Sequence, residues 1–201
     1  MACHFSFNNT LIIMNPKVAR GLNIAGALGL SSILIGGYIF QFVLWEFPCP
    51  LCLLVRMGFL GMILGFMLNL KFGIRPSHYG VTLVSSIFCG MVAMRQTLLH
   101  IVPGTGEYGT PVWGLHLYTW AFIISAATIL IVGVILMFDK KQFDEPVEEP
   151  GAKLSPLANI VFLLMITLAV ANAVTAFFEC GVTPCPDDPT QYKVIQEIEH
   201  K

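Results

Sequence analysis

The residues of this chain with the clearest capacity for chemistry are two closely spaced cysteine pairs. Cys49 and Cys52 form a C-x-x-C motif at the point where one long apolar segment ends and the next begins. Cys180 and Cys185 follow the last apolar segment. Thiols in C-x-x-C motifs exchange readily with disulfides. Placed at the edge of a membrane, such pairs could pass electrons between proteins outside the bilayer and a lipid-soluble carrier within it.

The residues around the first pair favour a reactive disulfide. Pro48 and Pro50 flank Cys49 and predict that a helix begins there, because proline is well tolerated in the first turn of a helix. Cys52 would then lie near the helix N-terminus, where the positive end of the dipole favours thiolate over thiol. A stabilised thiolate is a good leaving group, so a Cys49–Cys52 disulfide should be a good oxidant.

Arg56 follows Cys52 by four residues. In a helix the two side chains share a face and are separated by about 6 Å along the axis. An arginine inside a membrane helix is costly and is by default a functional candidate. The alternative is that Arg56 extends to the lipid headgroups. Its expected role is to stabilise negative charge on the Cys52 thiolate or on a reduced carrier.

A second polar group is expected near the same membrane surface. Arg95, Gln96 and His100 lie in the last third of a later apolar segment and are candidates for binding a ligand. For His100, a hydrogen bond to a loop carbonyl is an equally good interpretation. The next apolar segment begins with aromatic residues typical of a membrane interface: Trp113, His116, Tyr118 and Trp120. One of them could also line the binding site of a flat aromatic ligand.

The composition predicts the elements that must position these residues. Of 201 residues, 56% are hydrophobic and 11% are charged, whereas soluble domains have about 25% charged residues. Five apolar segments, 22–45, 51–70, 80–102, 115–138 and 156–178, are long enough to cross a bilayer as helices. We therefore expect one all-α membrane domain, a polytopic helical bundle (22–178) with an N-terminal segment (1–21) and a C-terminal redox tail (179–201). A net charge of −1 gives no indication of nucleic-acid binding.

The ends of the chain carry two further expectations. The first apolar segment is too long for a cleavable signal peptide and lacks an A-x-A-like exit. Residues 1–13 differ from the rest of the chain, and we interpret them as dispensable or as a start-site artefact. The acidic segment 187–201 is expected to be a solvated, disordered terminus rather than a docking site.

The distribution of Lys and Arg predicts the orientation. If the N-terminus is cytoplasmic, only Lys193 and Lys201 lie in outer segments, and the connector 139–151 is cytoplasmic. Positive charges concentrate on the cytoplasmic side of membrane proteins. This places both cysteine pairs outside. The inner segments would carry Lys17, Arg20, Lys71, Arg75, Lys140, Lys141 and Lys153.

The cysteines could also have other roles. Two short-spaced pairs could hold a structural zinc ion, but an oxidising compartment favours disulfides. A structural Cys180–Cys185 disulfide would close a very short loop and so contribute little stability. Cys89, inside an apolar segment, is interpreted as a small buried residue, and Cys3 is given no role.

Two runs of residues resemble the DsbB family of membrane disulfide-bond formation proteins. EFPCPLCLLVR at 46–56 resembles the family's C-x-x-C with an arginine four residues later, and MRQTLLHIVP at 94–103 resembles its third-helix motif near the bound quinone. The resemblance covers residues 20–138. It implies an oxidoreductase of the bacterial inner (plasma) membrane that supports protein folding as a chaperone system. Such proteins reoxidise a periplasmic DsbA-like thioredoxin-fold oxidase and pass the electrons to ubiquinone or menaquinone.

The chain also departs from the family pattern. The best-known members have four helices and carry the second cysteine pair between helices three and four. Here the segment 103–114 has no cysteine, and the second pair follows an additional fifth helix. Gln96 stands where the family has a histidine. The partner-facing role of Cys180 and Cys185 is therefore a hypothesis from topology.

The expected reaction begins when a partner thiolate attacks Cys185. Cys180 is then released to attack the Cys49–Cys52 disulfide, and Cys52 passes the electrons to quinone. Arg56 would stabilise charge on the quinone oxygens, helped by Arg95, Gln96 or His100. Two alternatives remain open: a quinol-driven thiol reductase resembling vitamin K epoxide reductase, and a non-catalytic membrane scaffold with a structural disulfide.

Overall fold

The computed structural model describes residues 16–102, 104, 106, 109–137, 143, 155–186 and 189–199. These residues contain no β-strand and form five long helices and one short helix. The helices are α1 (Pro16–Val43), α2 (Pro50–Phe72), α3 (Pro76–Leu99), α4 (Leu117–Met137), α5 (Pro156–Cys180) and α6 (Lys193–Glu199). The five long helices are all apolar enough and long enough to cross a membrane. This confirms the prediction of an all-helical protein with five membrane-spanning helices.

Proline marks the start of several helices, as expected from the sequence. Pro50, Pro76 and Pro156 each occupy the first turn, where the missing N–H has no intrahelical partner to lose. The first helix begins at Pro16 rather than at residue 22, because a helix can extend past the hydrocarbon while hydropathy marks only the apolar part. The interpretation of residues 1–13 lies outside the described residues, as does that of the connector 139–151 apart from Phe143.

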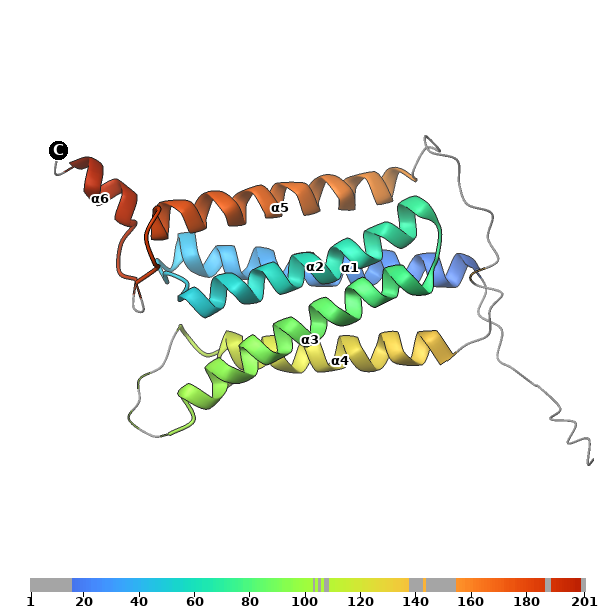
Figure 1. Cartoon of the computed structure of the whole chain (residues 1–201), viewed down its shortest axis with the longest axis horizontal. Helices are drawn as coiled ribbons and strands as arrows, with labels where there is room; N and C mark the ends of the chain where they lie inside the picture. The colour runs from blue at the N-terminus through green and yellow to red at the C-terminus, as the bar shows by residue number, and fades with distance from the viewer. Residues whose placement is uncertain are drawn as a thin grey trace, which may run out of the picture.

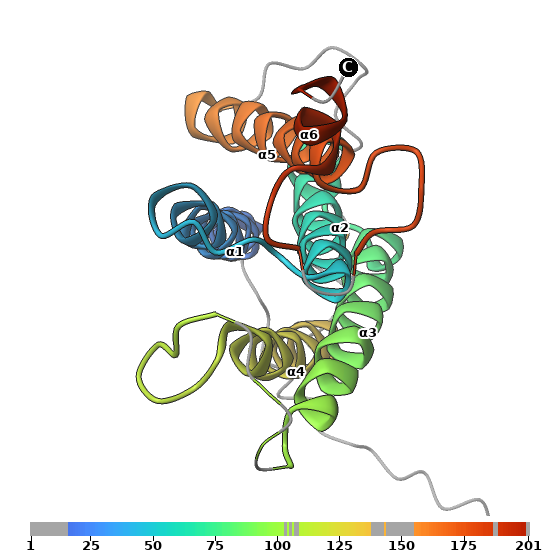
Figure 2. The same ribbon diagram turned by 90° about the vertical axis from the view of Figure 1, so that its left-hand side faces the viewer.

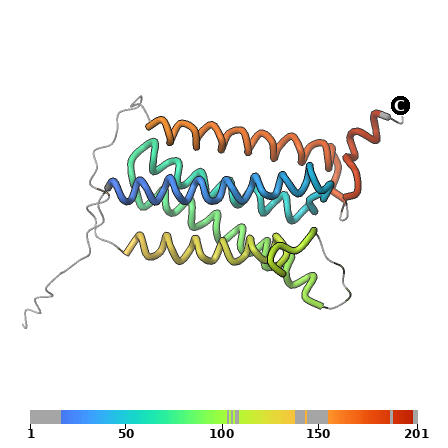
Figure 3. Tube along the Cα trace, turned by 180° about the vertical axis from the view of Figure 1, so that it is seen from behind, coloured from blue at the N-terminus to red at the C-terminus, as the bar shows by residue number. Residues whose placement is uncertain are grey.

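The central helix of the bundle is α2, which contacts each of the other four long helices. Seen from the end of the bundle, α1, α5, α3 and α4 surround it (Figure 2). Twelve residues of α2 are buried, against seven of α3 and six of α4. In the side view α3 crosses the bundle obliquely (Figure 1), and from behind α1 runs between α5 and α4 (Figure 3). Residues carried by α2 are therefore held from several sides.

Small residues allow α2 and α3 to pack closely. A Cβ atom added at Gly58 would lie 2.6 Å from Cys89 Cβ, and one added at Gly65 would lie 2.7 Å from the backbone N of Thr82. Helices in membranes associate through such close approaches because lipid provides no hydrophobic drive between them. Cys89 is fully buried at this contact, which confirms its interpretation as a small buried residue.

A polar cluster joins three helices at the end of the bundle away from the cysteine pairs. Asn69 Nδ2 donates to Asn23 Oδ1 at 2.8 Å, and Asn23 Nδ2 donates to Tyr79 Oη at 2.8 Å. Asn69 Oδ1 in turn accepts from the backbone N of Arg75 at 3.0 Å. These bonds connect α1, α2 and α3 inside an apolar bundle. The sequence analysis did not anticipate this cluster.

The other end of the bundle, where α1, α3 and α5 end and α2 and α4 begin, carries both cysteine pairs; we call it the cysteine end. Residues 189–199 lie against it, with α6 beyond the end of α5 (Figure 1). The Tyr192 ring packs edge-on against Phe47 at 4.9 Å, and its hydroxyl accepts a 3.1 Å hydrogen bond from Gln41. The expectation of a disordered tail is therefore wrong for these residues, because Tyr192 anchors them to the bundle.

Candidate redox site

The first cysteine pair lies at the start of α2. Cys49 is the N-cap residue, and its sulfur accepts a 3.2 Å hydrogen bond from the backbone N of Cys52. Both are free thiols, with their sulfur atoms 2.8 Å apart. Pro50 occupies the first turn between them, so the local sequence itself turns the two sulfurs toward each other. Cys49 is buried and Cys52 is half-buried.

Gln96, from α3, contacts both sulfurs. Its Nε2 lies 2.9 Å from Cys49 Sγ and 3.4 Å from Cys52 Sγ, and its Oε1 lies 3.6 Å from Cys52 Sγ. The side chain is fully buried. The hydrogen bond with Cys52, and then burial, raise the pKa of the Cys49 thiol above its usual range. Cys49 therefore holds its proton more firmly than a free cysteine does.

Arg56 lies one turn further along α2 and faces α1. Its Nη1 donates to Gln41 Oε1 at 2.7 Å and its Nη2 donates to the Gly37 carbonyl at 3.3 Å. The guanidinium carbon stands 4.6 Å from the centre of the Tyr38 ring. These contacts hold the cation within the bundle instead of leading it toward a headgroup. Arg56 is thus a fixed positive charge near the Cys49–Cys52 pair.

A cavity of about 130 Å³ opens beside this pair, between α1 and α4. Its polar lining includes Glu46 and Cys49 from the segment before α2, Cys52 and Arg56 from α2, and Gln96 from α3. Most of the remaining lining is apolar, with aromatic walls that include Phe40, Phe59, Tyr118 and Trp120. An apolar cavity with a few convergent polar groups is the usual form of a small-molecule site.

The three candidates that α3 and its C-terminal end carry lie in three different environments. Gln96 lines the cavity, but Arg95 is exposed and lines a different groove between α3 and α4. His100 caps the end of α3, with Nδ1 3.0 Å from the Gly106 carbonyl. Its ring lies 5.7 Å from that of Tyr118, which does line the cavity. His100 therefore supports the wall of the cavity rather than forming it.

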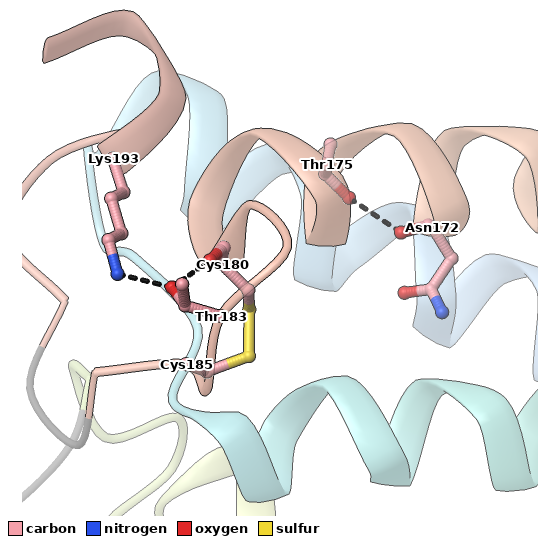
Figure 4. The surroundings of a disulfide bond; sticks show 6 residues. All are labelled: Asn172, Thr175, Cys180, Thr183, Cys185 and Lys193. Carbon is pink, nitrogen blue, oxygen red and sulfur yellow. Dashed lines mark hydrogen bonds between the residues drawn. A yellow bond between two sulfur atoms is a disulfide. The ribbon is translucent and has the colours of Figure 1, made fainter. Parts of the chain in front are cut away.

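The second cysteine pair lies at the end of α5. Cys180 is the last residue of that helix and is joined to Cys185 by a disulfide (Figure 4). Cys180 is buried and Cys185 is half-buried. Since these two sulfurs are bonded to each other, the four cysteines do not assemble a zinc site. Because α5 packs on α2, the disulfide loop lies beside the start of α2 (Figure 4).

The loop is fixed by the tail. Gly181, with φ 66°, turns the chain after α5, a backbone conformation that favours glycine. Thr183 Oγ1 donates to the Cys180 carbonyl at 3.3 Å and accepts a hydrogen bond from Lys193 Nζ (Figure 4). Lys193 begins α6, so the short helix and the disulfide loop are held together.

Sequence reasoning missed several residues of this site. Gln41 and Tyr38 hold Arg56 from α1, and Tyr192 reaches Gln41 from the tail. Glu179, the residue before Cys180, is buried and interacts electrostatically with Arg56 and Cys52. A signal for Glu179 was present, because it is the one acidic residue in the apolar segment 156–180.

Comparison with known protein families identifies part of the chain. Residues 19–107 match the family model of the disulfide bond formation protein DsbB. Over these residues, which are less than half of the chain, the protein is similar to DsbB disulfide bond formation proteins. DsbB proteins are membrane oxidoreductases that act in disulfide bond formation, and five apolar helices agree with a multi-pass membrane protein. The match includes Cys49, Cys52, Arg56 and Gln96, but not α4, α5 or the Cys180–Cys185 pair. Comparison with curated proteins and with solved structures gives no match.

Proposed function

We propose that this DsbB-like protein oxidises a periplasmic thioredoxin-fold oxidase of the DsbA type and passes the electrons through two cysteine pairs to membrane quinone. One observation carries this proposal: the apolar cavity between α1 and α4 is lined by the C-x-x-C pair together with Arg56 and Gln96. The second pair lies at the same end of the bundle, beside the start of α2.

The cavity suits a quinone ring. Apolar and aromatic walls match a flat ring, while Gln96 and Arg56 supply hydrogen-bond donors and positive charge for its oxygens. When bound, a quinone accepts two electrons and two protons. Arg56 would stabilise negative charge near the cavity, and Gln41 and Tyr38 would keep it oriented for that purpose. We assign quinone binding to Arg56 and Gln96, with Arg95 outside the site.

The two pairs would act in series. A partner thiolate attacks Cys185, the more exposed sulfur of the outer disulfide, and a second partner thiol completes its reduction. The outer dithiol then reduces the Cys49–Cys52 disulfide and returns to the disulfide form. Cys49 and Cys52 both line the cavity, and the position of Cys52 one turn from Arg56 supports the proposal that Cys52 is the sulfur that meets quinone.

Turnover with purified components tests this function. The protein in detergent is mixed with a reduced DsbA-like thioredoxin-fold protein and ubiquinone, and quinone absorbance and partner thiols are followed. Consumption of one quinone for every two partner thiols is expected, with none for Cys49→Ser or Cys52→Ser. Cys89→Ala, a change at a cysteine that does not itself line the cavity, should keep turnover. Absence of turnover favours the scaffold, and turnover only from quinol to an oxidised partner favours the reductase.

We also infer that the cysteine end faces the periplasm, on the basis of the seven-to-two distribution of Lys and Arg. Val182 lies in the disulfide loop and is 95% exposed, which makes it a suitable reporter. In intact spheroplasts, Val182→Cys should react with a membrane-impermeant maleimide. Protection of this thiol until the cells are lysed would reverse the orientation.

A further inference from the structure

A buried acid precedes Cys180 of the outer cysteine pair and interacts electrostatically with Cys52 of the inner pair. Glu179, in the last turn of α5, is 1% exposed. Its Oε2 is buried and has no hydrogen-bond partner among the residues that the structure describes. Burying a carboxyl group with an unused oxygen costs free energy. Acidic side chains in membrane helices commonly mark proton pathways.

The surroundings of Glu179 connect it to both pairs. Cys180, of the outer disulfide, is the next residue in the chain. Cys52 and Arg56, from α2, interact electrostatically with its carboxyl group. The other ionisable groups here are Tyr38 of α1, which stacks on Arg56, and Tyr192 and Lys193 of the tail, which bond to Gln41 and Thr183. Glu179 therefore lies where a proton could pass from one cysteine pair to the other.

We propose that Glu179 carries a proton from the outer cysteine pair to the inner pair during electron transfer between them. This inference rests on the proposed function, since it concerns the step in which the outer dithiol reduces the Cys49–Cys52 disulfide. Neither α5 nor Glu179 lies within the residues that match the DsbB family. The proposed proton carrier therefore belongs to the fifth helix, which lies outside the matched residues.

The step balances without another reactant. The Glu179 carboxylate takes the proton of the Cys180 thiol, and the Cys180 thiolate attacks Cys49. The Cys49–Cys52 bond breaks as the Cys180–Cys49 bond forms, and Cys52 leaves as a thiolate that takes the proton back from Glu179. Cys185 then attacks Cys180, re-forming the outer disulfide, and its proton passes to Cys49. Two electrons and two protons have moved inward, and Glu179 is again a carboxylate.

Three substitutions test the proposal in the full-length protein. Glu179→Gln keeps the size of the side chain but cannot exchange a proton in this way, and Glu179→Asp keeps the carboxyl group. Glu197→Gln makes the same chemical change at an exposed residue of α6 and is the control. Loss of a proton-transfer group typically lowers a rate by about 100-fold or more. We expect a loss of this size in the partner-driven turnover of Glu179→Gln, with the KM for quinone unchanged. Glu179→Asp should recover part of the turnover, and Glu197→Gln should turn over like wild type.

The pH profile separates proton transfer from packing. Wild type and Glu179→Asp should both show a rise in rate as the carboxyl group ionises, and Glu179→Gln should lack it. If Glu179→Gln and Glu179→Asp lose the same fraction of turnover and both keep the wild-type pH profile, Glu179 has a packing role. That result would overturn the inference. Wild-type turnover in Glu179→Gln overturns it as well. A wild-type protein that reduces no quinone instead overturns the proposed function, and this inference with it.

Thiol trapping before the assay confirms the starting state. The Cys180–Cys185 disulfide should be present in each variant. Glu179→Gln keeps the shape of the side chain, but it removes a negative charge that interacts with the buried Arg56 cation, so it is expected to lower stability. If the Glu179→Gln protein cannot be produced, the pH profile of Glu179→Asp tests the proposal. A profile displaced along the pH axis from that of wild type supports proton transfer. An identical profile with a reduced rate contradicts it.

Discussion

Gln96 Nε2 lies 2.9 Å from Cys49 Sγ and 3.4 Å from Cys52 Sγ, so one amide of α3 contacts both sulfurs at the start of α2. An amide both donates and accepts hydrogen bonds, so it can serve a thiol and a thiolate alike. Gln96 also lines the cavity next to these sulfurs. The same side chain can therefore respond to the state of the cysteines and to an occupant of the cavity.

The first prediction concerns this amide. Gln96→Met keeps the length of the side chain but removes its donors, and should lower the rate of quinone reduction by about 10- to 100-fold, the effect of losing a hydrogen bond to a charged group. Gln96→His, which restores a donor, should retain more activity. Thr97→Ala alters the neighbouring residue, whose hydroxyl bonds within α3, and serves as the control. Wild-type kinetics in Gln96→Met would show that the amide has no part in the reaction.

The second prediction concerns the positive charge beside the cavity. Arg56→Ala should reduce quinone turnover by about 100-fold or more, because it removes a fixed charge from an apolar site. Arg56→Lys should retain part of the activity, since charge remains while the planar fork that meets Gln41 and Gly37 is lost. Arg95→Ala removes an arginine from the separate groove and should affect turnover far less. The opposite ranking of Arg56→Ala and Arg95→Ala would place the quinone on the other face of α3.

The third prediction follows from the raised pKa of Cys49. A thiol with a raised pKa has a smaller thiolate fraction at any pH below that pKa, so Cys49 in the reduced protein should alkylate more slowly than free cysteine. The leading cause is the hydrogen bond with Cys52, and Cys52→Ala should therefore accelerate alkylation of Cys49. Iodoacetamide labelling with site-resolved mass spectrometry measures both rates. Rapid labelling of Cys49 at neutral pH in the wild-type protein would contradict this assignment.

Local sequence was sufficient to predict part of this arrangement. Proline at residue 50 and cysteines three residues apart define a capped helix start, and Arg56 follows one turn later whatever surrounds the helix. Long apolar runs likewise predict the five spans, because lipid accepts only helices or closed barrels. These features depend on neighbours in the chain, which the sequence displays directly.

Other parts of the site depend on how the helices pack. Arg95 and Gln96 are adjacent in the sequence, yet only Gln96 faces the cysteines, because the rotation of α3 is set by its close contact with α2. Glu179 and Tyr192 reach the site only because α5 packs on α2 and the tail returns to the bundle. Hydropathy shows that a helix crosses the membrane but not which side it presents to its neighbours.

The fourth prediction concerns stability at the opposite end of the bundle. Asn69→Ala removes the bonds to Asn23 and to the Arg75 backbone, and it leaves buried partners unsatisfied. The expected loss is about 1–3 kcal/mol in the free energy of unfolding. Asn159→Ala, at an exposed residue of α5, should be neutral. Both free energies can be measured by unfolding the purified variants in mixed micelles of increasing SDS content. Equal losses of stability in Asn69→Ala and Asn159→Ala would argue against a structural role for the polar cluster.

The last prediction divides the work between the two outer cysteines. Cys180 is buried at the end of α5 beside α2, while Cys185 is half-buried in the loop beyond it. An incoming thiolate reaches the more accessible sulfur of a disulfide, so the partner should bond to Cys185 and release Cys180 to attack the inner pair.

Cys180→Ser leaves Cys185 as the one thiol of the outer pair. If the partner is supplied with its reactive cysteine as a mixed disulfide with thionitrobenzoate, the Cys185 thiolate displaces thionitrobenzoate, and the resulting Cys185–partner disulfide should accumulate as a reducible band on a non-reducing gel. The partner must be supplied as a variant with its own resolving cysteine replaced, so that it cannot release itself. A band that forms only with Cys185→Ser would mean that Cys180 meets the partner and that the loop opens before the first exchange.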